Sequence, residues 1–184
     1  GTISASLLPE PLPLVASRSF GPSLRILTYN VQMLPSFVSA GTDPENARRI
    51  AKRIRSSGYD FVVLNEVFDE DARDAFREVL PTAYPYHVDY LSGGTIANED
   101  AGLMFWSRFP IVPLAKDDYR VLKLVPNPTP PPALINVGTG NCTGTDCDKV
   151  AFLEFDACDG DDCWSEKGVG FVRVRNPETH VVYN

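Results

Sequence analysis

Two stretches of the chain place apolar side chains at intervals of three and four residues, which is the spacing of one helix face. The first helix is expected to begin at Thr42 or Asp43 and to end at Gly58. The second is expected to begin after Asp69 or Asp71. The inward-facing residues are then Ala47, Ile50, Ala51 and Ile54 in the first helix and Ala72, Ala75, Phe76 and Val79 in the second.

Apolar runs that are too short for helices predict the strands. The runs that begin at Leu24 and Phe61 end in polar residues, namely Asn30 and Glu66. Further strands are expected over residues 86–91, 102–107, 111–114, 150–155, 169–174 and 180–183. The order strand, helix, strand, helix and then several strands predicts a mixed α/β layer structure. These strands amount to one sheet, so we expect a partner layer on the face that the helices leave open.

The length of 184 residues suits one domain, and 43% of them are hydrophobic, as in ordinary globular proteins. Residues 1–22 contain Pro9, Pro11 and Pro13 and lack the basic start of a signal peptide. We therefore expect an N-terminal extension over residues 1–22 and a domain over residues 23–184. No apolar run reaches the roughly 18 residues that would span a bilayer.

The formal net charge of −7 argues against nucleic acid as a partner, because phosphate backbones are bound by basic surfaces. Five basic residues nevertheless crowd the first predicted helix, at positions 48, 49, 52, 53 and 55. Such a run forms either a binding surface or a solvated helix face with favourable charges near the helix C-terminus, and we favour the solvated face.

The cysteines form two local pairs in sequence, Cys142 with Cys147 and Cys158 with Cys163. Four cysteines allow three disulfide pairings, of which the local one closes two small loops. A zinc site is the alternative, although the spacing is unusual for zinc. Disulfides form in oxidising compartments, so this interpretation predicts a secreted, extracellular or periplasmic protein.

Glu66 is the first candidate for chemistry, because a carboxylate at the end of a buried run is costly unless it is paired or binds a cation. Its plainer alternative is an ion pair with one of the arginines. Asn30 ends the earlier apolar run and would lie beside Glu66 if the two strands are neighbours. Its plainer alternative is a turn-forming role, since Asn is frequent at strand ends.

Five segments, in this order, resemble the endonuclease/exonuclease/phosphatase superfamily, and within it the neutral sphingomyelinase C branch. They span residues 24–35, 60–69, 99–111, 167–171 and 180–184, and include the runs Asn-Val-Gln-Met-Leu-Pro and Asn-Glu-Val-Phe. The resemblance implies a DNase I-like fold, a four-layer α/β/β/α sandwich, of which this chain would supply one sheet and its helices. It covers nearly all of the predicted domain.

The resemblance also implies a phosphodiesterase that depends on Mg²⁺ or another divalent cation, with Glu66 as a metal ligand and Asn30 as a catalytic partner of metal or phosphate. The implied substrate is sphingomyelin or a related phospholipid at a membrane surface, cleaved to release phosphocholine. A different substrate would make the protein an extracellular nuclease or another phosphoesterase. A third alternative is a non-catalytic half-domain that acts as a binding partner.

Some residues that the family uses to orient and activate water are expected beyond position 184. The chain would then represent an N-terminal half that is inactive without the C-terminal half of the same protein. His180 matches the start of a family strand rather than its catalytic histidine, and His87 lies within a strand pattern. We expect both histidines to be structural.

Overall fold

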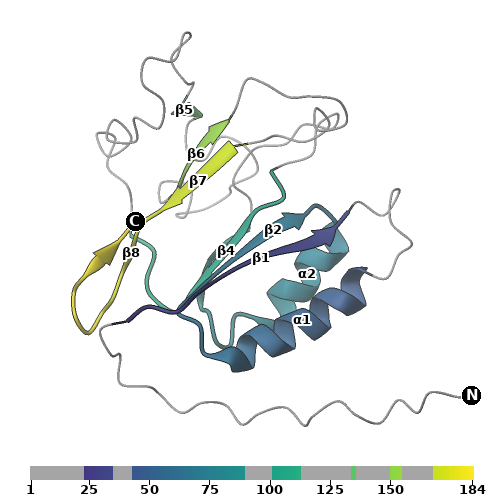
Figure 1. Cartoon of the computed structure of the whole chain (residues 1–184), viewed down its shortest axis with the longest axis horizontal. Helices are drawn as coiled ribbons and strands as arrows, with labels where there is room; N and C mark the ends of the chain where they lie inside the picture. Colours follow the sequence, from purple (N-terminus) through teal and green to yellow (C-terminus); the bar gives the residue numbers. More distant parts are fainter. Residues whose placement is uncertain (1–22, 35–42, 90–100, 113–133, 136–149, 155–167) are drawn as a thin grey trace, which may run out of the picture.

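The computed structural model describes residues 23–34, 43–89, 101–112, 134–135, 150–154 and 168–184 (Figure 1). Its main feature is a four-stranded mixed sheet with the strand order β1-β2-β4-β3. The strands are β1 (Ile26–Met33), β2 (Phe61–Val67), β3 (Tyr86–Val88) and β4 (Met104–Ser107). β1 pairs parallel with β2, whereas β4 runs antiparallel to both β2 and β3.

The two helices, α1 (Asp43–Ser57) and α2 (Glu70–Val79), lie side by side on one face of this sheet (Figure 1). Gly58, with φ +73°, follows the last residue of α1, and Asp69 caps α2 by accepting a hydrogen bond from the Ala72 amide. All inward-facing residues predicted from the sequence are buried except Ile50, which is partly buried. Both predicted helices are thus confirmed, while Thr42 lies outside the described residues.

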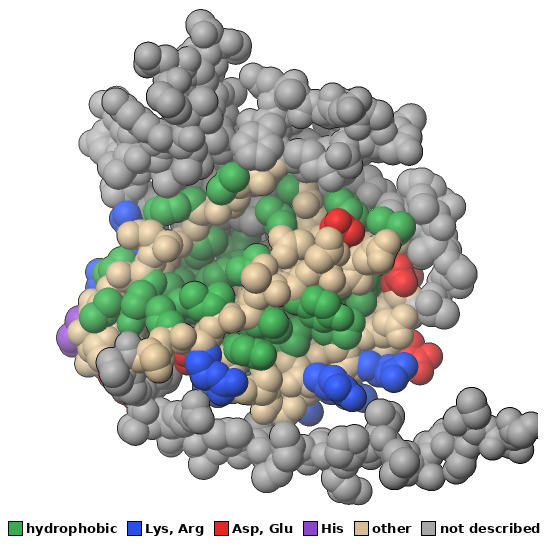
Figure 2. Space-filling model, viewed as in Figure 1, with side chains coloured by type: hydrophobic (Ala, Val, Ile, Leu, Met, Phe, Trp, Pro, Cys, Tyr) green, Lys and Arg blue, Asp and Glu red, His purple; other side chains and the backbone are tan. Residues whose placement is uncertain are grey.

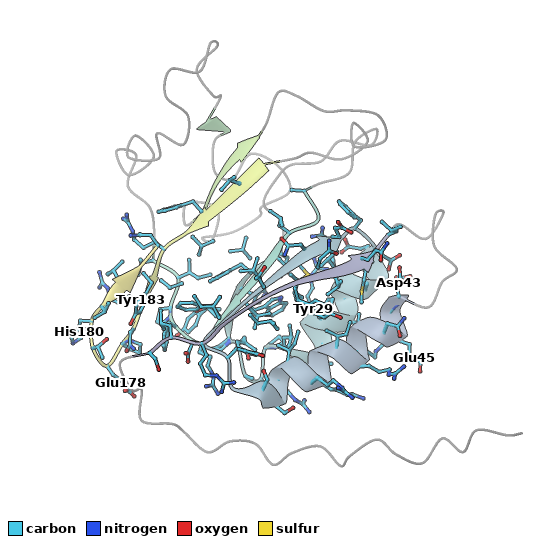
Figure 3. All side chains as sticks on the ribbon, viewed as in Figure 1. Tyr29, Asp43, Glu45, Glu178, His180 and Tyr183 are labelled. Carbon is cyan, nitrogen blue, oxygen red and sulfur yellow. The ribbon has the colours of Figure 1, made fainter. Side chains whose placement is uncertain are left out.

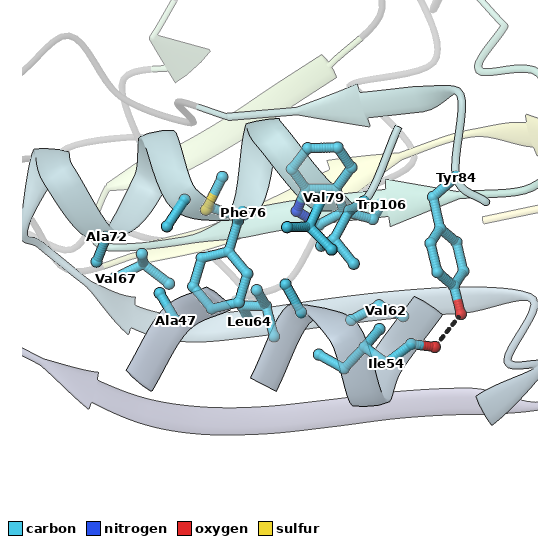
Figure 4. Packing of buried hydrophobic residues seen from close by; sticks show 14 of the residues in the cluster. Ala47, Ile54, Val62, Leu64, Val67, Ala72, Phe76, Val79, Tyr84 and Trp106 are labelled. Carbon is cyan, nitrogen blue, oxygen red and sulfur yellow. Dashed lines mark hydrogen bonds between the residues drawn. The ribbon is translucent and has the colours of Figure 1, made fainter. Parts of the chain in front are cut away.

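The main core fills the space between the helices and the sheet (Figure 4). Val62 and Leu64 of β2 and Trp106 of β4 contribute from the sheet, and Phe76 contributes from α2. Tyr84 is fully buried, and its hydroxyl donates a hydrogen bond to the Ile54 carbonyl at 3.2 Å. Alternate residues of β2 therefore face the helices, as expected for a strand that is buried by helices on one side.

A smaller apolar cluster lies on the other face of the sheet, at the beginning of β2. Phe61, Phe109 and Val174 are its buried members. The ring of Tyr183 lies edge-on to Phe61, with centroids 6.0 Å apart. The expected partner layer therefore exists in part, and it covers this face around Phe61.

The remaining strands form two smaller sheets. A three-stranded antiparallel sheet has the order β5-β6-β7, and β8 pairs with β9. The strands are β5 (Leu134–Ile135), β6 (Val150–Glu154), β7 (Gly168–Val172), β8 (Val174–Arg175) and β9 (Val182–Tyr183). None of the helices in the described part of the chain is long and apolar enough to cross a membrane.

These sheets differ from the single sheet expected from the sequence. The predicted strand 169–174 is interrupted at Arg173, because the chain leaves β6 there and pairs with residues 110–112 instead. Those residues make only an isolated bridge, Ile111 with Val174. Pro110 has no backbone N–H to donate, which limits the pairing. The predicted strand 111–114 is therefore reduced to this bridge, and residues 113–114 lie outside the described part.

Candidate active site

Asn30 and Glu66 lie at the same edge of the main sheet, namely the edge toward which the carboxyl ends of the parallel strands β1 and β2 point. β1 and β2 run parallel, and Asn30 pairs in register with Asn65, the residue before Glu66. The carboxyl ends of parallel strands meet at one edge of a sheet. In open α/β sheets, ligands commonly bind next to these carboxyl ends. The expected proximity of Asn30 to the residues beside Glu66 is therefore present in the structure.

The backbone of Glu66 adopts a left-handed conformation, with φ +60°. Leu64 and Val67 are both fully buried in the core beneath the helices, although they are three residues apart. In a regular strand they would face opposite sides of the sheet. The left-handed residue between them changes the alternation, and the Glu66 carboxylate is only partly buried as a result.

β1 contains an irregularity directly opposite this point. Its pairing advances from Asn30 to Met33 while the partner strand advances only from Asn65 to Val67, so β1 holds one extra residue. Gln32 lies in this bulge with φ +51°, and its amide donates to Asn30 Oδ1 at 3.0 Å. The strand continues beyond Asn30, which corrects the expectation that the strand ends there, and Asn30 does shape the local turn.

Hydrogen bonds hold the backbone after Glu66 from both sides. On one side, the Val67 amide donates to the Gly102 carbonyl at 2.8 Å. On the other, the amides of Phe68 and Asp69 both donate to the Met33 carbonyl, at 2.9 and 3.1 Å. The segment that follows Glu66 is thus fixed between β1 and the chain that enters β4. This arrangement holds Glu66 in a conformation that it would seldom adopt alone.

The carboxylate of Glu66 forms no hydrogen bond or ion pair with the described residues. The ion pairs of the described residues include Arg48 with Glu78, Arg77 with three other acids, and, when His87 is protonated, His87 with Asp89. The alternative in which an arginine neutralises Glu66 therefore finds no support among the described residues. A half-buried carboxylate without a cationic partner is suited to binding a cation.

The donor atoms at this edge fit a hard divalent cation. Glu66 offers a carboxylate, and the Asn30 carbonyl oxygen retains one lone pair beside the one that accepts from Gln32. Mg²⁺ prefers oxygen ligands and usually keeps several waters, so one or two protein ligands suffice. Within the described ranges, no group of three or more His, Cys, Asp or Glu residues could hold a metal. The described residues thus provide part of a site.

Asn65 is a neighbour of the site that the sequence interpretation missed. Its side-chain amide donates to Thr28 Oγ1 at 3.3 Å across the two strands, and its partner in register is Asn30. Three polar side chains therefore share one face of the sheet at this edge. The signal was present in the sequence, because Asn65 is a second polar residue in the run that Glu66 ends.

Neither histidine lies at this edge. His180 is exposed, in the turn between β8 and β9, with φ +60° (Figure 3). His87 stacks on the ring of Trp106 with centroids 4.4 Å apart, away from Glu66. The four cysteines lie outside the described residues, so the disulfides remain a prediction.

A comparison with protein families decides the wider relationship. Residues 27–160 match the model of the Endonuclease/Exonuclease/phosphatase family. The chain belongs to this family. Within the family, the Sphingomyelinase C of Leptospira interrogans is 36% identical over 111 residues, which are 56% of this chain and 19% of that protein. Sphingomyelinase C 2 of a Leptospira interrogans strain is 34% identical over 93 residues, which are 48% of this chain and 15% of that protein.

Solved structures confirm the fold of this family member. The crystal structure of sphingomyelinase C from Streptomyces griseocarneus matches with a TM-score of 0.60 and 24% identity, over 88% of this chain and 48% of that one. The structure of SmcL matches with a TM-score of 0.58 and 20% identity, over 84% and 44%. The DNase I-like fold is thus confirmed. The chain spans less than half the length of these structures and less than a fifth of the curated relatives.

Proposed function

We propose that the intact protein is a secreted, Mg²⁺-dependent phosphodiesterase of the sphingomyelinase C type. It hydrolyses sphingomyelin or a related phospholipid and releases phosphocholine. Residues 23–184 form the N-terminal half of its domain. The observation that supports this proposal most directly is the placement of Asn30 and Glu66 at one sheet edge, in a chain 36% identical to a sphingomyelinase C over 111 residues.

In this proposal the Glu66 carboxylate holds the cation, and its left-handed backbone directs it away from the apolar core. When bound, Mg²⁺ supplies Lewis-acid polarisation of a phosphoryl oxygen. Asn30, on β1, lies opposite Asn65 of β2. The hydrogen bond that its side chain accepts from the Gln32 amide orients it. It contributes its free amide donors to a phosphate oxygen, or its carbonyl oxygen to the cation.

Charge favours a phospholipid over nucleic acid as the substrate. The chain has a net charge of −7, and its basic run lies on α1, in the helix layer (Figure 2). All five residues of this run are exposed, and one of them, Arg48, pairs with Glu78 at 3.0 Å. These charges form a solvated helix face. They lie on the helix-covered side of the sheet, whereas Asn30 and Asn65 lie on its other face.

The remaining groups of the site come, in this proposal, from the C-terminal half of the same protein. A phosphodiester hydrolase needs groups that orient and deprotonate water, and the described residues near Glu66 include no histidine. We therefore expect the 184-residue chain to be inactive by itself.

The decisive experiment replaces Glu66 by Gln in the intact protein, which keeps the side-chain shape and removes its charge. We expect Mg²⁺ affinity, measured by calorimetry, and hydrolysis of sphingomyelin vesicles both to fall by about 100-fold or more. Glu78→Gln is the matched control, since Glu78 is an exposed acid on α2 whose partner is Arg48. An unchanged Mg²⁺ affinity in Glu66→Gln would remove Glu66 from the metal site.

The substrate is tested separately with the unmodified intact protein. Release of phosphocholine from sphingomyelin vesicles is compared with cleavage of plasmid DNA under the same Mg²⁺ concentration. Cleavage of DNA without release of phosphocholine would replace the lipid proposal by an extracellular nuclease. Absence of both activities, together with absence of Mg²⁺ binding, would favour a binding module.

A further inference from the structure

Gly102 is packed more tightly than any ordinary residue would allow. It is buried, with φ +62°, a conformation that side chains other than hydrogen disfavour. A Cβ atom built on it would lie 2.6 Å from Cε1 and 2.8 Å from Cζ of Phe68. The Phe68 ring therefore rests on the bare backbone of Gly102, a contact that only glycine permits.

The Phe68 ring that makes this contact belongs to a residue only two positions after Glu66, the candidate metal ligand. Gly102 also accepts the Val67 amide hydrogen bond, so it touches the segment after Glu66 through one backbone and one ring contact. Glu66 needs such support, because its left-handed conformation persists only where the surroundings determine it.

We propose that Gly102 is a positioning residue for Glu66. By admitting the Phe68 ring, it fixes the backbone that directs the Glu66 carboxylate toward the sheet edge. The proposal rests on the proposed function, since the consequence that matters is cation binding by Glu66. It adds a residue that acts on the site from the segment just before β4, without contacting cation or substrate.

The test is Gly102→Ala in the intact protein, with Mg²⁺ affinity measured by calorimetry. The added methyl displaces the ring and the backbone that follows Glu66, so affinity should fall by about 10–100-fold, as for other residues that orient metal ligands. Gly58→Ala is the matched control. Gly58 also has positive φ, +73°, but its Cβ would meet only Arg25 Nη1, at 3.5 Å.

Both alanine variants should unfold at a lower temperature, because both place a Cβ at positive φ. A purely structural role predicts that each loses a few degrees in Tm and that neither changes Mg²⁺ affinity. A positioning role predicts that only Gly102→Ala loses affinity. Equal affinities in the two folded variants would overturn the proposal.

Phe68→Leu in the Gly102→Ala background provides a rescue, because the smaller side chain makes room for the methyl. We expect Mg²⁺ affinity to recover by several-fold over Gly102→Ala alone. If Gly102→Ala does not fold, the Mg²⁺ affinity of the single variant Phe68→Leu tests the proposal. It removes the ring contact while keeping glycine, and an unchanged Mg²⁺ affinity would overturn the proposal.

The outcomes separate the positioning role of Gly102 from the metal-binding role of Glu66. Loss of affinity in Glu66→Gln with no loss in Gly102→Ala rejects only the positioning role. No loss in Glu66→Gln rejects the metal site itself, whatever Gly102→Ala does.

Discussion

The backbone conformation of Glu66 is unfavourable by itself, and that cost is informative. A left-handed conformation at a residue with a Cβ costs about 1–2 kcal/mol. At Glu66 the cost is offset by the hydrogen bonds that the following amides donate to Gly102 and Met33. Strain that is held in place by the surrounding structure is found often at functional sites. The left-handed conformation of Glu66 therefore lowers the stability of the fold, whereas the proposed metal binding requires it.

This link predicts an unusual order of stability. In a regular strand, Gly is less stable than Ala by about 0.5–1 kcal/mol. At position 66 we expect Glu66→Gly to be more stable than Glu66→Ala, by about 1 kcal/mol, because glycine adopts φ +60° without strain. Urea unfolding of the two variants measures the difference. The reverse order would mean that Glu66 is not left-handed in solution.

Tyr84 connects stability to pH. Burial raises the pKa of the Tyr84 phenol above its ordinary value of about 10. The unfolded chain therefore ionises first as the pH rises, and stability that is complete below about pH 10 is lost at higher pH, up to the folded pKa.

Replacing Tyr84 by Phe should weaken this alkaline loss of stability. At neutral pH the cost should stay near or below about 1 kcal/mol, since Ser57 Oγ also donates to the Ile54 carbonyl, at 2.7 Å. Thermal melts between pH 7 and 11 measure both effects. Tyr86→Phe, at an exposed position, is the control. An unchanged pH profile in Tyr84→Phe would show that another group controls alkaline unfolding.

At the scale of elements, the beginning of α2 and the site share one short segment. Asp69 caps α2 through a hydrogen bond of 2.8 Å from the Ala72 amide, and its own amide donates to the Met33 carbonyl. The cap is therefore part of the structure that follows Glu66. A substitution that removes the cap should therefore affect the candidate metal site as well as the stability of α2.

Asp69→Ala should destabilise the intact protein by about 1 kcal/mol, the usual cost of losing a helix cap. It should also lower Mg²⁺ affinity, by less than Gly102→Ala does, because the backbone bonds to Met33 remain. Asp74→Ala is the control. Asp74 is exposed on the same helix and pairs with Arg77, so its loss should cost no more than about 0.5 kcal/mol. Equal losses in both variants would contradict the capping role.

The elements also explain which parts could be predicted from the sequence. α1 and α2 follow from local spacing and caps, so their inward-facing residues were predicted nearly without error. Glu66 stands out because an acid ends an apolar run. The bulge at Gln32 and the close contact at Gly102 depend on residues distant in sequence, and no local pattern reveals them. The interruption at Arg173 likewise results from a change of pairing partner.

At the scale of the whole molecule, the main sheet is unevenly protected. Its helix-covered face is closed, whereas the other face is covered around Phe61 and carries polar residues near Asn30. β1 is an edge strand eight residues long, and no described strand pairs with its outer edge. Ile26 and Tyr29 on this strand are 58% and 43% exposed. Figure 2 shows further hydrophobic side chains on the viewed face of the molecule.

An exposed strand edge flanked by apolar side chains favours pairing with another chain. We therefore expect the isolated 184-residue chain to self-associate through β1 and to bind a hydrophobic dye, as measured by analytical ultracentrifugation and dye fluorescence. If the intact protein has the proposed C-terminal half, we expect that half to cover this strand and to suppress both signals.

Ile26→Lys tests whether β1 is the surface responsible, because a charge on an edge strand opposes pairing with a second strand. Tyr86→Lys is the matched control, since Tyr86 is 39% exposed on β3, the opposite and much shorter edge of the same sheet. Both variants change the net charge equally, so general repulsion between chains cannot distinguish them. If β1 mediates association, only Ile26→Lys shifts the isolated chain toward the monomer. An equal shift in both variants would assign the effect to net charge. A monomeric, dye-silent parent chain would contradict the open edge itself.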